Sequence, residues 1–104
     1  MPKRNQHAAE INELHEKAAQ VRLQSVETQL SLVLTLCASA ETEILLGHPE
    51  VAHRLARKIR HHSEAISFHL DEPGHLPDID VSDLRKQLTE VEKRTDQINA
   101  RVKI

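Results

Sequence analysis

Histidine is the side chain in this sequence with the greatest capacity for chemistry. The chain has eight histidines in 104 residues; five of them fall between His48 and His69, and His75 follows soon after. Neutral imidazole is a common metal ligand, and residues three or four positions apart share one face of a helix. His61 and Glu64 have this spacing, and an acidic segment follows His69. The sequence therefore suggests a His/carboxylate metal site, with the candidate ligands His61, Glu64, His69 and His75.

The spacing of these residues does not match an established metal motif. Di-iron bundles carry Glu-x-x-His twice, whereas here the order is His61-x-x-Glu64 and it occurs once. No His-Glu-x-x-His element and no cysteine pair is present. We therefore expect no cofactor and keep metal binding as the alternative hypothesis. The simpler expectation is structural, with His62 partly buried against Val33 and His69 paired with Glu27 at the surface, although histidines that ionise near pH 6.5 also allow a pH-sensitive assembly.

The other reactive side chains lack the partners that catalysis requires. Cys37 is the sole cysteine and lies in the most apolar part of the chain, where burial raises the pKa of a thiol and lowers its reactivity. Serine and threonine residues have no histidine and acid at a recognisable spacing. Phe68 is the sole aromatic residue, although ligand pockets are usually lined in part by aromatic side chains. We expect the protein not to be an enzyme.

A basic stripe formed by Arg54, Arg57, Lys58 and His61 is the one feature that could contact phosphate groups. The net charge is −2, the following segment is acidic, and one phenylalanine cannot form a base-stacking platform. The stripe is therefore expected to be solvated, and a nucleic-acid partner is not expected.

The stretch from Leu30 to Leu46 must organise the core, because it holds the densest run of leucine, valine and isoleucine. At helical periodicity it carries two apolar stripes about a third of a turn apart, so residues 30–37 are apolar on nearly every face. Such a helix must be covered on every face. The run is too short for the ~20 residues that cross a bilayer, so no membrane contact is expected, and without a secretion signal at the N-terminus we expect a cytoplasmic location.

The chain is predicted to be all-α and to form a helical bundle in a single domain, residues 1–104. A long helix is expected over about 6–46, with Asn5 as its N-cap, because no helix breaker lies between His7 and Gly47. Gly47 and Pro49 predict a short turn and an antiparallel second helix over about 49–70. Facing positions in this hairpin should have numbers that add to about 96, which places Glu41 near Arg54 or Leu55.

The third predicted helix covers about 82–102, after an acidic Pro/Gly loop at 71–81. Its apolar seam has coiled-coil spacing, interrupted at Thr95. The sequence leaves open whether this helix turns back to complete a three-helix bundle, which we favour slightly, or continues along the first half of the long helix.

The functional hypothesis is self-association. Residues 1–24 are sparse in apolar side chains and could project from the bundle, leaving one apolar stripe for a second chain. We expect a non-enzymatic interaction module with a scaffold or adaptor role, which forms a homodimer or higher oligomer, or binds another helical protein. The predicted contact residues are Ile11, Leu14, Ala18, Val21, Leu32, Leu36, Leu84, Leu88, Val91 and Ile98.

Overall fold

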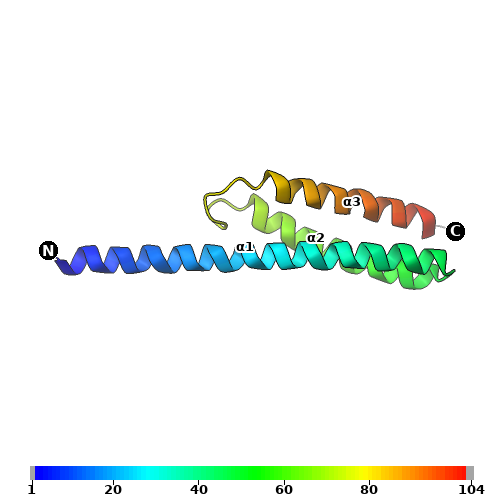
Figure 1. The fold of residues 1–104 in the computed structure, drawn as a ribbon, viewed down its shortest axis with the longest axis horizontal. Coiled ribbons are helices and arrows are strands. Elements are labelled where there is room, and N and C mark those ends of the chain that lie inside the picture. The colour runs from blue at the N-terminus through cyan, green and yellow to red at the C-terminus, as the bar shows by residue number, and fades with distance from the viewer. Residues whose placement is uncertain (1, 103–104) are drawn as a thin grey trace.

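The protein is all-α, as predicted. The computed structural model describes residues 2–102, with side chains from residue 8 onward, and the described residues form three helices (Figure 1). These are α1 (Pro2–Leu45), α2 (Pro49–Asp71) and α3 (Ser82–Val102). The observed bounds lie within one residue of the predicted ones, except at the start of α1.

Helix α1 begins four residues earlier than predicted, and Asn5 lies inside it instead of capping it. Proline is accepted in the first turn of a helix, because the backbone N–H that it lacks would have no partner there. Nothing between Pro2 and the expected start interrupts a helix. The weak capping signal of Asn5 therefore did not mark the boundary.

The turn between α1 and α2 is a Schellman motif. Gly47 has a φ of 79°, a left-handed conformation that glycine adopts without strain. The backbone N–H of His48 donates to the Glu43 carbonyl at 2.8 Å, and that of Gly47 donates to the Ile44 carbonyl at 3.1 Å. Pro49 then occupies the first turn of α2, so the chain reverses within three residues.

All three helices share one apolar core. Helix α2 returns along the second half of α1, and α3 runs back along both (Figure 1). The direction of α3 that the sequence left open is thus that of an up-down-up three-helix bundle. The buried core residues are Val26, Leu30, Val33, Cys37 and Ala40 of α1, Ala52, Ala56, Ile59, Ile66 and Leu70 of α2, and Leu88, Val91 and Ile98 of α3.

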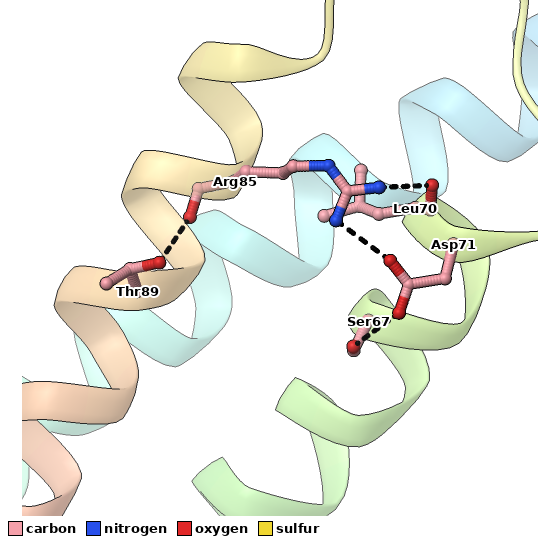
Figure 2. Close-up of polar contacts among 5 residues, drawn as sticks. All are labelled: Ser67, Leu70, Asp71, Arg85 and Thr89. Carbon is pink, nitrogen blue, oxygen red and sulfur yellow. Dashed lines mark hydrogen bonds and ion pairs between the residues drawn. The ribbon is translucent and has the colours of Figure 1, made fainter.

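Polar contacts tie α3 to both of the other helices. At one end Arg85 donates to the Asp71 carboxylate at 2.8 Å and to the Leu70 carbonyl at 2.9 Å (Figure 2). The second bond satisfies a carbonyl in the last turn of α2, which has no partner within that helix. Further along, Arg94 donates through Nε to the Glu41 carboxylate at 2.9 Å. The prediction that Glu41 lies near Arg54 or Leu55 missed this partner, which α3 supplies.

The first third of α1 extends beyond the bundle (Figure 1). The described part of the molecule measures 70 × 20 × 15 Å, with a radius of gyration of 18.6 Å. A compact domain of this length would have a radius of gyration of about 13 Å. We call residues 8–21 of α1, which lie largely outside the bundle and whose side chains are described, the arm.

Candidate interaction surface

The arm presents a row of apolar side chains to solvent. Ile11, Leu14 and Val21 are 41%, 65% and 64% exposed, and Ala18 is exposed between them. The spacing of 3, 4 and 3 places these four residues on one face of the helix. Exposed apolar side chains are ordinary when scattered singly, but a contiguous row on an otherwise solvated helix is typical of a contact surface.

This row continues onto the bundle. Leu32 is 41% exposed and Leu36 is half-buried. Both lie at the edge of the α1 surface that α2 and α3 cover, because the buried residues Val33 and Cys37 point about a quarter turn away. The first six predicted contact residues therefore share one face of α1, which we call the α1 row: Ile11, Leu14, Ala18, Val21, Leu32 and Leu36. Leu36, at the end of the row, also packs in part against the core of its own chain.

The predicted contact residues of α3 lie inside the bundle instead of on its surface. Leu88, Val91 and Ile98 are buried in the core of the chain itself, and Leu84 packs against that core. Thr95, the polar interruption, is also buried and donates its hydroxyl to the Val91 carbonyl at 2.8 Å. The α3 seam thus packs against α1 and α2 within the chain, so it is not available as a surface for a second chain.

The loop after α2 folds back onto the base of the arm. The guanidinium of Arg22 donates a hydrogen bond to the carbonyl of His75. Ala19 is buried there, and the arm and loop together line a hollow whose apolar members include Val21, Leu76 and Ile79. No residue pattern predicts this contact, because its polar anchor is a backbone carbonyl.

Two further exposed apolar residues near this junction were missed by the sequence prediction. Phe68 is 58% exposed, and its ring meets the ring of His75 edge to face at 5.7 Å. Ile79 is 46% exposed in the loop. Phe68 carries a usable signal, since it is a large apolar residue that does not lie on the buried stripe of α2.

The candidate metal ligands are only partly brought together. The rings of His69 and His75 lie 5.0 Å apart, whereas Glu64 faces α3 in a hollow that it shares with Arg60 and Asp96. Among residues whose side chains the structure describes, no group of three or more His, Cys, Asp or Glu could hold a metal ion. His61 lies beside His62, with ring centroids 6.0 Å apart.

The surroundings of His69 favour its neutral form. Partial burial lowers the pKa of His69, and the nearby His75 and Arg22 lower it further. Its Nδ1 atom is buried without a hydrogen-bond partner, so the predicted surface pair with Glu27 is not formed at this nitrogen. Burial also raises the pKa of the Cys37 thiol, which keeps the thiol protonated and unreactive.

Comparison with protein-family models, with curated protein sequences and with solved structures finds no match for this chain. Within the described residues, no helix has an apolar stretch long enough to cross a membrane. The described residues form a three-helix bundle from which α1 extends, with an apolar face exposed to solvent (Figure 1).

Proposed function

We propose that the protein is a non-enzymatic helical module that self-associates through the α1 row and serves as a scaffold or adaptor. The observation that carries this proposal is the arm, a helical extension whose apolar side chains at Ile11, Leu14 and Val21 are in water. A helical segment as short as the arm is only marginally stable in water without tertiary contacts. Packing of its apolar face against another helix supplies the missing stabilisation.

A second copy is the partner that fits this surface best. The α1 row continues from the arm onto the bundle, so each copy offers both an apolar arm and an apolar strip on which an arm can lie. A surface that carries both halves of a contact can close on itself through a two-fold axis, which is the commonest symmetry of oligomers. In such a pair the exposed apolar side chains of both copies are covered.

Sedimentation equilibrium at micromolar concentration tests the proposal. One copy has a mass of 11.8 kDa, and we expect a concentration-dependent rise toward twice that mass. Leu14→Asp should return the chain to a monomer while the circular dichroism spectrum and cooperative melting of the bundle persist. A wild-type chain that stays a monomer at these concentrations would rule the proposal out.

A further inference from the structure

We infer that two copies pair through α1 in antiparallel orientation, with each arm lying along the outer face of the other copy's bundle. This inference rests on the proposed self-association and specifies its geometry. It predicts which residues meet: Leu14 faces Leu32 of the second copy, and Ile11 faces Leu36 of the second copy.

The first argument is the order of side-chain sizes along the exposed face of α1. Large apolar residues occupy both ends of the face, with Ile11 and Leu14 on the arm and Leu32 and Leu36 on the bundle. The middle is formed by residues smaller or more polar than leucine: Ala18, Val21, Ser25 and Gln29. When two such helices run antiparallel with facing numbers that add to about 46, large apolar residues meet each other at both ends and smaller residues meet at the centre.

The second argument is the length of the contact. Pairing of the arms alone, from Ile11 to Val21, would span only about 15 Å at 1.5 Å per residue. Continuing to Leu36 extends the contact to about 37 Å. A stable interface requires upward of ~1,000 Å² of buried surface, so the longer contact is the one that can hold a dimer at micromolar concentration.

The third argument is charge. The arm carries Glu10, Glu13, Glu16 and Lys17, whereas α1 has no charged residue between Thr28 and Ala40. An arm laid on that uncharged strip meets no like charge on α1. A parallel pair in register would instead place Glu10 and Glu13 beside the same residues of the second copy, where like charges are unfavourable. Arg22, near the centre of the long contact, is directed to the carbonyl of His75 in its own chain.

The antiparallel arrangement also accounts for the exposed residues at the arm–loop junction. The two-fold axis falls near residue 23, next to Val21 and to Ile79, which line one hollow. Val21 and Ile79 are 64% and 46% exposed in one copy. Both copies bring these residues to the centre of the pair, where the second chain covers them.

Disulfide trapping with two variants, Leu14→Cys and Leu32→Cys, tests the orientation. Each variant is made with Cys37 retained, since that thiol is buried, and again with Cys37→Ala to remove it from the reaction. The two variants, one carrying an affinity tag, are oxidised mildly either separately or mixed, and the covalent dimers are separated by mass. In an antiparallel pair, residue 14 of one copy lies about 27 Å from residue 14 of the other. This is far beyond the ~7 Å between Cα atoms that a disulfide allows.

We expect the mixed 14–32 disulfide to form at least tenfold faster than either homodisulfide. A predominant 14–14 disulfide would overturn the inference in favour of parallel or arm-only pairing. A wild-type dimer by sedimentation without a 14–32 disulfide in either background would also overturn it, while leaving self-association intact. A wild-type monomer would instead refute the proposed function, on which the inference depends.

Discussion

Replacement of Leu14 by alanine separates the arm's role in association from the stability of the bundle. Complete burial of a leucine side chain contributes about 1.5–3 kcal/mol. Leu14 is 65% exposed in a single copy, so about two-thirds of this value, roughly 1–2 kcal/mol, becomes available when a second copy covers it. A two-fold dimer contains the residue twice, so association should weaken by ~2–4 kcal/mol, a rise of about 30- to 1,000-fold in the dissociation constant.

Leu45 offers a matched control for this experiment. It is 78% exposed at the other end of α1 and lies outside the α1 row. Leucine and alanine both favour helix, so neither substitution should disrupt α1 itself. Sedimentation equilibrium should give a dissociation constant close to wild type for Leu45→Ala and a much higher one for Leu14→Ala, while circular dichroism of diluted samples gives similar melting of the bundle. Equal dissociation constants for the two variants would refute the assignment of the arm as the contact surface.

Further predictions concern the bundle itself. Ile59→Ala, at a fully buried position, should lower the free energy of unfolding by about 2–5 kcal/mol in urea titrations. Arg94→Ala should cost less than about 1 kcal/mol in the same assay, because its pair with Glu41 is partly exposed. The pKa of His69 is lowered, chiefly by burial, so the unfolded chain binds a proton at this residue more readily than the folded chain does. His69 should therefore leave the free energy of unfolding unchanged above pH 6.5 and reduce it as the pH falls below that value. His69→Gln should flatten the dependence of the free energy of unfolding on pH between pH 7 and pH 5. Burial raises the pKa of the Cys37 thiol, so iodoacetamide should modify it slowly in the folded protein and rapidly in concentrated urea, and equal rates would contradict its burial.

The sequence predicted the helices well because their boundaries depend on local chemistry. Gly47 ends one helix and Pro49 begins the next because of their own backbone preferences, which do not depend on the rest of the fold. The pattern of leucine, valine and isoleucine distinguishes the buried face of each helix from its solvated face. The start of α1 was missed because Pro2 and Asn5 both suit a helix N-terminus, and the residues between them favour neither boundary.

The partners of the helix faces were harder to predict. A heptad seam such as that containing Leu88, Val91 and Ile98 has the same composition whether it packs within one chain or between two, so periodicity could not show that this seam is internal. Glu41 could meet an arginine from either neighbouring helix, and the position of α3 decided in favour of Arg94. The contact of Arg22 with the loop depends on a backbone carbonyl, which every residue possesses.

Under the proposed pairing, the exposed arm would link the lifetime of the protein to its abundance. A helix without tertiary support opens often, and opened segments are the sites at which proteases cleave. In a single copy the residues around Leu14 would open more often than in a pair, where the second chain would cover them. Surplus copies without a partner would therefore be cut first, and the paired population would survive.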